Sequence, residues 1–307
     1  MKFVILALPG NEQLAAGLAA KLQTEVGRMT VRRFPDGESY VRIETPVDGR
    51  NVVLACGLHD PDSKIPALLF AASTARELGA ARVGLVAPYL AYMRQDKRFN
   101  EGESITSVHF AELVSRYVDW LVTVDPHLHR RSSLDDIYSI PGIAVHAAPL
   151  LAQWIRANVD SPVLIGPDSE SEQWVSEVAR GANAPWLVLE KIRRGDRDVS
   201  VSIPDPGALR GRTPVLVDDI ISTARTMIAT IRHLAGLGLA KPVCVGVHAV
   251  FAGTAYADLA AAGVARIATC NTIAHESNAI DVSGLLTEAV LNLTAIRAAA
   301  AADGGAP

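Results

Sequence analysis

The sequence predicts an α/β protein built from two doubly wound lobes with mainly parallel sheets. Short runs of β-branched residues alternate with Ala- and Leu-rich helical patterns along the chain, and this order of elements repeats once. Hydrophobic residues make up 49% of the chain and aromatic residues only 5%. Small aliphatic side chains therefore fill the core, which is typical of parallel sheets covered by helices.

The expected elements follow from these patterns in chain order. Strands are expected at Phe3–Leu8, Val52–Cys56, Arg82–Ala87, Trp120–Val124, Val163–Ile165, Trp186–Leu189, Pro214–Val217, Lys241–Val247 and Ala265–Thr269. Helices are expected at Glu12–Leu22, Lys64–Leu78, Ser107–Tyr117, Pro149–Asn158, Ser171–Arg180 and Thr223–Leu237. From about Ala298 the chain is Ala-rich and ends in Asp-Gly-Gly-Ala-Pro, so this end is expected to fray.

The chain has 307 residues, enough for two domains of ordinary size. Proline and glycine interrupt the pattern near Gly142–Pro149, which predicts the join. We therefore expect one domain at 1–146 and a second at 147–290. Residues 291–307 are expected to form a helix end and a frayed tail.

Charge and composition narrow the possible partners. The formal net charge is −4, with no block of like charges, so neither a nucleic acid nor a membrane is indicated as a partner. No apolar stretch is long enough to cross a bilayer. Cys56, Cys244 and Cys270 lie far apart in apolar runs and lack CxxC spacing, which favours buried thiols in a reducing cytoplasm.

The segment from Thr213 to Met227 carries the clearest chemical signal. An apolar strand runs into Asp218 and Asp219, and a Ser/Thr loop then leads into a helix. Ligands of open α/β sheets bind at the carboxyl ends of strands, and a helix N-terminus offers free N–H groups to a phosphate. The two acids could hold sugar hydroxyls or a hydrated Mg²⁺, and the loop a phosphate. The alternative is an ordinary helix start, capped by Ser222.

The stretch Val217-Asp-Asp-Ile-Ile-Ser-Thr-Ala-Arg-Thr226 resembles the phosphoribosyl-pyrophosphate loop of type I phosphoribosyltransferases and ribose-phosphate pyrophosphokinases. The resemblance implies two phosphoribosyltransferase-like domains, with this loop in the second. It also implies that Asp218 and Asp219 bind the ribose diol. The loop that binds the 5-phosphate would then comprise Ser222, Thr223, Ala224, Arg225 and Thr226.

Two upstream segments favour the pyrophosphokinases. Arg33-Phe-Pro-Asp-Gly-Glu-Ser-Tyr-Val-Arg-Ile43 is similar to their F-x-D-G-E segment. This implies that Phe34, Asp36 and Glu38 contact the adenine of ATP in a neighbouring subunit, hence a homo-oligomer. Ala87-Pro-Tyr-Leu-Ala-Tyr-Met-Arg-Gln-Asp-Lys-Arg-Phe99 is similar to their P-Y-x-x-Y-x-R-Q-D signature, in which Arg94, Gln95 and Asp96 would bind the nucleotide.

Three further segments match in order. Thr123-Val-Asp-Pro-His-Leu-His129 resembles the segment whose first histidine, here His127, approaches the Mg²⁺ of Mg·ATP; His129 is left open. Asp168 matches a position near the Mg²⁺ or the ribose, although a helix-capping acid is the plain alternative. Leu189-Glu-Lys-Ile-Arg193 resembles the catalytic K-x-R element, which assigns catalysis to Lys191 and Arg193. The charged run from Glu190 to Asp198 independently predicts an exposed hairpin, whose plain interpretation is a solvated turn.

The chain also departs from the commonest family pattern. Ser222 stands where most members have Asp, which resembles the smaller class III branch and implies less elaborate allostery. Arg225 replaces a usual Gly, and Asp168-Ser-Glu-Ser171 replaces a small turn and adds Glu170. These changes keep alternative functions open.

The resemblance implies that the pyrophosphoryl group of Mg·ATP moves to the C1 hydroxyl of ribose 5-phosphate. The products would be phosphoribosyl pyrophosphate and AMP, with Mg²⁺ as cofactor. One alternative is a phosphoribosyltransferase that uses the same loop. The other is a silent or differently specific homologue that binds nucleotide.

Overall fold

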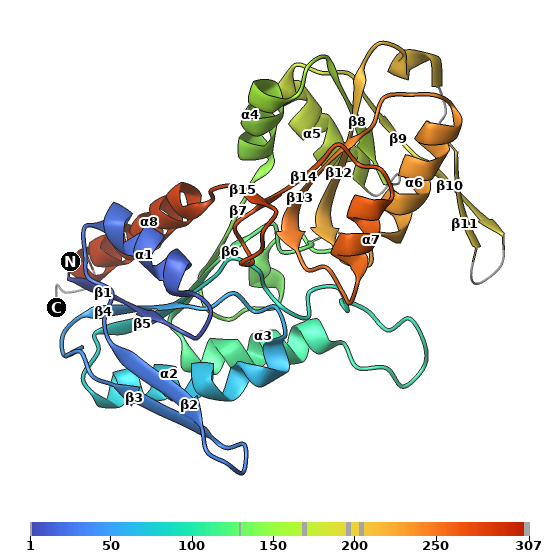
Figure 1. The fold of residues 1–307 in the computed structure, drawn as a ribbon. Helices are drawn as coiled ribbons and strands as arrows, with labels where there is room; N and C mark the ends of the chain where they lie inside the picture. The colour runs from blue at the N-terminus through green and yellow to red at the C-terminus, as the bar shows by residue number, and fades with distance from the viewer. Residues whose placement is uncertain (1, 129, 168–170, 195–197, 203–205, 304–307) are drawn as a thin grey trace. The chain divides into compact units, whose positions relative to one another are not determined.

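The computed structural model describes residues 2–128, 130–167, 171–194, 198–202 and 206–303. It describes the side chains of these residues except at 190–202, 206, 208 and 296–303. Two parallel sheets, of 5 and 6 strands, each packed against helices, confirm the predicted α/β class (Figure 1).

The chain folds into two compact units. Unit 1 comprises 1–145 together with 283–307, and unit 2 comprises 146–282. The sequence-based division assigned 283–290 to the second domain. Helix α8 (Ser283–Asp303) instead groups with unit 1, because it packs against α1 (Glu12–Leu22), β6 (Trp120–Val124) and β7 (Gly142–Val145). It continues past Ala298, where fraying is predicted.

The sheet of unit 1 has the order β1-β4-β5-β6-β7, with every neighbouring pair parallel. Its other strands are β1 (Phe3–Ala7), β4 (Asn51–Ala55) and β5 (Arg82–Ala87). The central strands are buried on both faces, which explains their continuous apolar runs.

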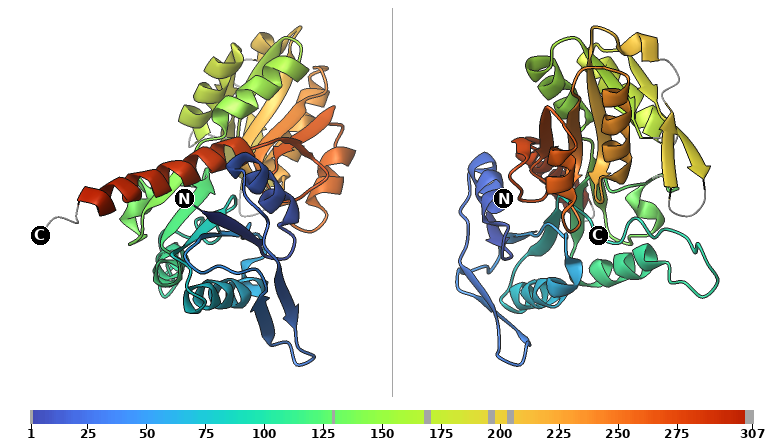
Figure 2. Two further views of the ribbon diagram at one scale, coloured as in Figure 1. Left: turned by 90° about the vertical axis from the view of Figure 1, so that its left-hand side faces the viewer. Right: turned by 45° about the vertical axis from the view of Figure 1, so that its right-hand side comes forward.

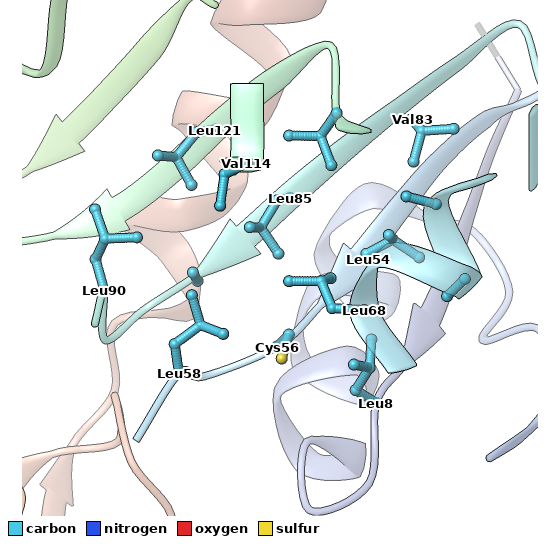
Figure 3. Close-up of a cluster of buried hydrophobic side chains, with 14 of the residues drawn as sticks. Leu8, Leu54, Cys56, Leu58, Leu68, Val83, Leu85, Leu90, Val114 and Leu121 are labelled. Carbon is cyan, nitrogen blue, oxygen red and sulfur yellow. The ribbon is translucent and has the colours of Figure 1, made fainter. Parts of the chain in front are cut away.

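One face of this sheet packs against α2 (Ile65–Glu77) and α3 (Thr106–Tyr117) (Figure 1). Figure 3 shows the cluster between them, where Leu54, Leu85 and Leu121 of the strands meet Leu68 of α2 and Val114 of α3. Helices α1 and α8 contact each other and the strands of the same sheet (Figure 2). Short 3₁₀ helices lie at Pro61–Ser63 and Leu134–Asp136.

An antiparallel hairpin, β2 (Met29–Arg33) and β3 (Ser39–Ile43), adds a second sheet to unit 1. Met29, Val31, Val41 and Ile43 pack against the core from one face of the hairpin. Neither strand was predicted from periodicity, since both carry arginines on the other face.

Unit 2 contains the sheet β15-β14-β13-β12-β8-β9, also parallel throughout. Helices α6 and α7 cover the face that contains Ile165, Leu216 and Cys244, and helices α4 and α5 pack on the sheet from the other side (Figure 1). The strands are β8 (Pro162–Gly166), β9 (Trp186–Val188), β12 (Thr213–Ile221), β13 (Val243–Ala249), β14 (Arg266–Cys270) and β15 (Asn278–Ile280). The helices are α4 (Ala148–Asn158), α5 (Glu172–Ala182), α6 (Arg225–Gly236), α7 (Ala255–Ala261) and a 3₁₀ turn at Pro206–Leu209.

A second hairpin, β10 (Glu190–Arg194) with β11 (Asp198–Ser202), follows β9. It occupies the charged run for which a hairpin was predicted. Among the described helices, none combines the length and apolarity needed to cross a lipid bilayer.

Candidate functional site

In unit 1, two groups of residues predicted to bind ATP and its Mg²⁺ follow strands β5 and β6, which are neighbours in the sheet. Parallel strands end at the same edge, so the segments after them lie at one edge of the sheet. Pro88 accepts a hydrogen bond at its carbonyl from Val124 N at 3.2 Å, which joins the segment after β5 to the last residue of β6.

Arg94, Gln95 and Asp96 occupy the turn after β5. The turn begins at Tyr92, whose φ of 62° is left-handed, an uncommon conformation for a bulky side chain. Gln95 N donates to Tyr92 O at 3.3 Å, and Gln95 Oε1 accepts from Thr106 Oγ1 at 3.3 Å. Gln95 therefore joins the turn to the start of α3, whereas Arg94 is exposed.

The Asp96 side chain is only 4% exposed and forms an ion pair with Arg130. Arg130 Nη1 lies 3.1 Å from Asp96 Oδ1 and 3.2 Å from Oδ2. Arg131 Nη2 donates to Asp96 O and to Ser107 Oγ, each at 3.4 Å. The Asp96 carboxylate is thus paired within the protein, which suits it to positioning Arg130 more than to binding a ligand directly.

Asp125 and His127 follow β6, with left-handed φ values of 34° and 56°. Asp125 N donates to Val145 O at 3.0 Å, and His127 N donates to Asp125 O at 2.9 Å. The tight turn leaves His127 half-buried directly beyond the strand. His129 lies outside the described residues.

Phe34, Asp36 and Glu38 lie in the exposed turn of the β2–β3 hairpin. Asp36 Oδ1 accepts from Glu38 N at 3.2 Å, and Phe34 N donates to Glu38 O at 2.8 Å, which closes the turn. Arg32 Cζ lies 4.5 Å from the centroid of the Phe34 ring. The turn therefore presents an aromatic ring and two acids to the outside of unit 1.

The turn at Asp60–Lys64 connects the β2–β3 hairpin to the turn that carries Arg94. It was not singled out from the sequence. Asp62 accepts a hydrogen bond from the Tyr92 hydroxyl, and Ser63 O accepts from Arg33 Nη2 of the hairpin at 3.0 Å. The pKa of Tyr92 is raised to about 12, by burial first and then by the bond to Asp62. This connection depends on side chains about 30 residues apart, which no local pattern indicates.

In unit 2, Asp218 and Asp219 lie on β12 and are half-buried. Asp218 stands in register with Gly246 of β13. A Cβ at Gly246 would lie 2.6 Å from Ile221 Cδ1, so only glycine leaves Ile221 its place beside the acids. The strand thus delivers two carboxylates close to its carboxyl end.

The loop after β12 turns into α6 through Ala224, whose φ is 54°. Ala224 is the residue preceding the helix, and no side chain caps it, so the alternative of an ordinary helix start capped by Ser222 is not observed. The first N–H groups of a helix lack helical acceptors, so those of α6 can donate hydrogen bonds to an anion. Ser222 and Thr226 are half-buried, and Thr223 and Arg225 are exposed.

The neighbouring loop after β13 supports this one through the backbone. Phe251 N donates to Ile221 O at 2.9 Å, and Ala252 N donates to Ser222 O at 3.1 Å. Buried His248 lies in register with Ile220, and its Nδ1 lies 2.9 Å from Thr272 Oγ1. Thr272 Oγ1 donates its hydrogen to Val247 O, so in the bond between Thr272 and His248 the donor is His248 Nδ1. A histidine inside an apolar strand was the sequence signal for this hydrogen bond, and it was missed.

The remaining predicted residues are only partly described. Lys191 and Arg193 lie on β10, with backbone partners Val201 and Val199 on β11, and their side chains are outside the described set. Asp168 and Glu170 also lie outside the described residues. Within the described part, no three His, Cys, Asp or Glu side chains group into a metal site.

The fold and the loop after β12 define the class: an α/β protein with a phosphoribosyltransferase unit. Residues 133–283 match the phosphoribosyl transferase domain, and residues 3–117 match the N-terminal domain of ribose phosphate pyrophosphokinase. A ribose-phosphate pyrophosphokinase of Methanopyrus kandleri is 33% identical over 95% of this chain and 99% of its own. One of Sulfurisphaera tokodaii is 34% identical over 81% of this chain and 86% of its own. The chain belongs to the ribose-phosphate pyrophosphokinase family.

The crystal structure of phosphoribosylpyrophosphate synthetase from Mycobacterium smegmatis has the same fold. Its TM-score is 0.82, covering 96% of this chain and 99% of that chain at 22% identity. The predicted arrangement of two phosphoribosyltransferase-type units is therefore confirmed.

Proposed function

We propose that this chain transfers the pyrophosphoryl group of Mg·ATP to the C1 hydroxyl of ribose 5-phosphate, giving phosphoribosyl pyrophosphate and AMP. The observation that carries the proposal is the pair of carboxylates on β12, followed by an uncapped helix start. That arrangement suits a sugar phosphate. Its occurrence in a chain similar to ribose-phosphate pyrophosphokinases over 95% of its length favours this reaction over others with the same loop.

Asp218 and Asp219 would accept hydrogen bonds from the ribose hydroxyls. The backbone of 222–226, with Ser222, Thr223 and Thr226, would hold the 5-phosphate at the positive end of the α6 dipole. Arg225 is exposed, and Ala224 makes the tight turn in place of glycine, so the arginine leaves the backbone free to approach the phosphate. This supports an active enzyme over a silent homologue.

The C1 hydroxyl oxygen would attack the β-phosphorus in line, and the bond from this phosphorus to the bridging α-oxygen would break as AMP leaves. Such transfers gain most from positioning and from neutralised charge on the transferring oxygens. Lys191 and Arg193, on the β10–β11 hairpin, are the cations we assign to this task.

Arg94 and Gln95 lie at the same sheet edge as His127, and we assign them to the nucleotide. Mg²⁺ prefers oxygen ligands, keeps several waters and commonly binds through phosphates with one or two protein contacts. His127 and Asp168 are the residues we assign beside it.

Phe34, Asp36 and Glu38 lie on an exposed hairpin turn, a position suited to a partner's adenine, so we propose a homo-oligomer. Ser222 in the loop leads us to propose the class III branch. Cys56, Cys244 and Cys270 are all buried as thiols, and we propose a place in the reducing cytoplasm.

The products of the reaction test the proposal. Phosphorus NMR of ATP, Mg²⁺ and ribose 5-phosphate with the purified protein is expected to show AMP and a C1-linked diphosphate. ADP as the product would instead indicate transfer of one phosphoryl group. Release of pyrophosphate from supplied phosphoribosyl pyrophosphate and a base, without ATP, would indicate a phosphoribosyltransferase. Bound but unchanged ATP would indicate a silent homologue.

A further inference from the structure

A salt bridge ties together the segments that follow β5 and β6. Arg130 Nη1 donates to both carboxylate oxygens of Asp96, at 3.1 Å and 3.2 Å. The Asp96 side chain is 4% exposed and that of Arg130 is 38% exposed. Asp96 is therefore held inward, while the Arg130 side chain is partly exposed beside the segments that carry Arg94 and His127.

Arg130 and Arg131 determine the sign of the charge at this edge of the sheet. Residues 94–103 contain three basic and three acidic side chains, which balance. In residues 125–131, Arg130 and Arg131 outweigh Asp125, which leaves one excess positive charge. A planar guanidinium with several N–H donors is well suited to phosphate oxygens, and pairing with a carboxylate reduces the rotamer freedom it would lose on binding.

An exposed aromatic ring lies beside Arg130. Phe99 is 57% exposed, and its ring centroid lies 6.0 Å from Arg130 Cζ and 5.2 Å from Lys97 Nζ. Glu103 holds the backbone of this turn, since its Oε2 accepts from Phe99 N at 2.8 Å and from Asn100 N at 3.0 Å. An exposed ring on a fixed turn offers a stacking face to a base.

We propose that Arg130 is a nucleotide-binding residue that contacts the phosphates of ATP, with Asp96 as its positioning residue and Phe99 as a second stacking surface for the base, in addition to the partner subunit's Phe34. The assignment deepens the proposed function and rests on it for the reaction served. It moves Asp96 from direct nucleotide contact to the holding of Arg130.

Two probes separate the parts of this site. Binding of Mg·ATP and of Mg-tripolyphosphate, which lacks the base, is measured by titration calorimetry without the sugar. Arg130→Gln is expected to weaken the binding of both probes by about ten- to a hundredfold, the effect of losing a charge-assisted hydrogen bond. Arg130→Lys should restore part of the lost affinity, because it keeps the charge. Phe99→Leu should weaken the binding of ATP but not that of tripolyphosphate.

Asp96→Asn tests the positioning role. Asp96→Asn is expected to weaken the binding of ATP less than Arg130→Gln does. The double variant should bind ATP about as weakly as Arg130→Gln alone, because both substitutions act through one contact. In steady-state assays Arg130→Gln raises the KM for ATP and leaves that for ribose 5-phosphate unchanged, a split that general loosening of the fold does not produce. Arg116→Gln, on exposed α3 surface, is the matched control and binds both probes normally.

Wild-type affinity of Arg130→Gln for both probes overturns the inference. So does a variant that unfolds at a lower temperature and loses affinity for the sugar phosphate equally. If the wild type binds ATP but makes no phosphoribosyl pyrophosphate, the proposed reaction fails, and the binding titrations still decide the role of Arg130. A wild type that binds neither probe overturns both.

Discussion

At the scale of single residues, Lys64 shows how one half-buried cation organises a loop. Its Nζ donates to Gly57 O at 2.9 Å and to His59 O at 2.6 Å, and lies 3.1 Å from His59 Nδ1. An ammonium can only donate, so His59 Nδ1 accepts and the ring is neutral. Burial, followed by the charge of Lys64, lowers the pKa of His59 below its ordinary 6.5.

This shift predicts a pH dependence of stability. Because the folded-state pKa is the lower one, the unfolded chain takes up the proton first as the pH falls. His59 therefore contributes stability that is present above pH 6.5 and is lost as the pH falls from 6.5 through the folded-state pKa. Denaturant unfolding at a series of pH values should show a shallower acid-side decline for His59→Gln than for the wild type. An identical decline in both would contradict the assignment, and His109→Gln, on the exposed face of α3, is the control.

Ala224 gives a second prediction at this scale. Its left-handed φ of 54° disfavours any side chain with a Cβ, by about 1–2 kcal/mol. Ala224→Gly is therefore expected to raise the free energy of unfolding, by about 0.5–1 kcal/mol after the greater chain entropy of glycine is subtracted. Ala229→Gly, inside α6, should lower it by about 1 kcal/mol. Loss of stability in both variants would show that Ala224 is not left-handed.

Sequence reasoning proposed site residues that lie near the ends of strands in short motifs, such as Asp218, Asp219 and His127. It did not single out Arg130, although this residue directly follows the segment ending at His129. Its partner Asp96 is 34 positions away, and only the register of neighbouring strands brings the two segments together. Pairings of this kind depend on tertiary packing, which leaves no periodic trace in the sequence.

At the scale of elements, the central strands could be predicted closely because they are buried on both faces. β5 and β6 have the predicted bounds, and so does α1. The β2–β3 hairpin escaped because its strands alternate core residues with Arg32 and Arg42 over only 5 residues each. α7 was missed because it has only 7 residues, too few for a helical period to be evident.

Close packing between β5 and β6 makes Gly84 indispensable. A Cβ there would lie 1.9 Å from Cε2 of the buried Trp120, on the strand paired with β5. Gly84→Ala should therefore lower the free energy of unfolding by about 1–3 kcal/mol or more, since the indole cannot move without disturbing the core. Gly236→Ala, where a Cβ meets nothing within 4 Å, should be neutral or slightly stabilising. Equal denaturation midpoints for Gly84→Ala and the wild type would contradict this packing.

At the scale of the whole molecule, the hairpin turn of Phe34 and the turn of Arg94 are both in unit 1, yet we propose that they serve different active sites of an oligomer. This predicts complementation between subunits. Phe34→Ala and Arg94→Gln should each be inactive alone, whereas co-expressed mixed oligomers should regain part of the activity. Mixed sites that combine the intact Phe34 of one chain with the intact Arg94 of the other explain the recovery. Inactive mixed oligomers would place both residues in the same subunit's site.

The central claim is that ATP is cleaved to AMP only when the sugar phosphate is in place, held by Asp218 and Asp219 on β12. The most direct test measures AMP released from Mg·ATP with and without ribose 5-phosphate, for the wild type and the Asp218→Asn, Asp219→Asn double variant. The account predicts AMP from the wild type only with the sugar, and a much higher KM for ribose 5-phosphate in the double variant, with ATP binding unchanged. AMP release without the sugar, or no AMP from a folded wild type that binds ATP, would contradict it.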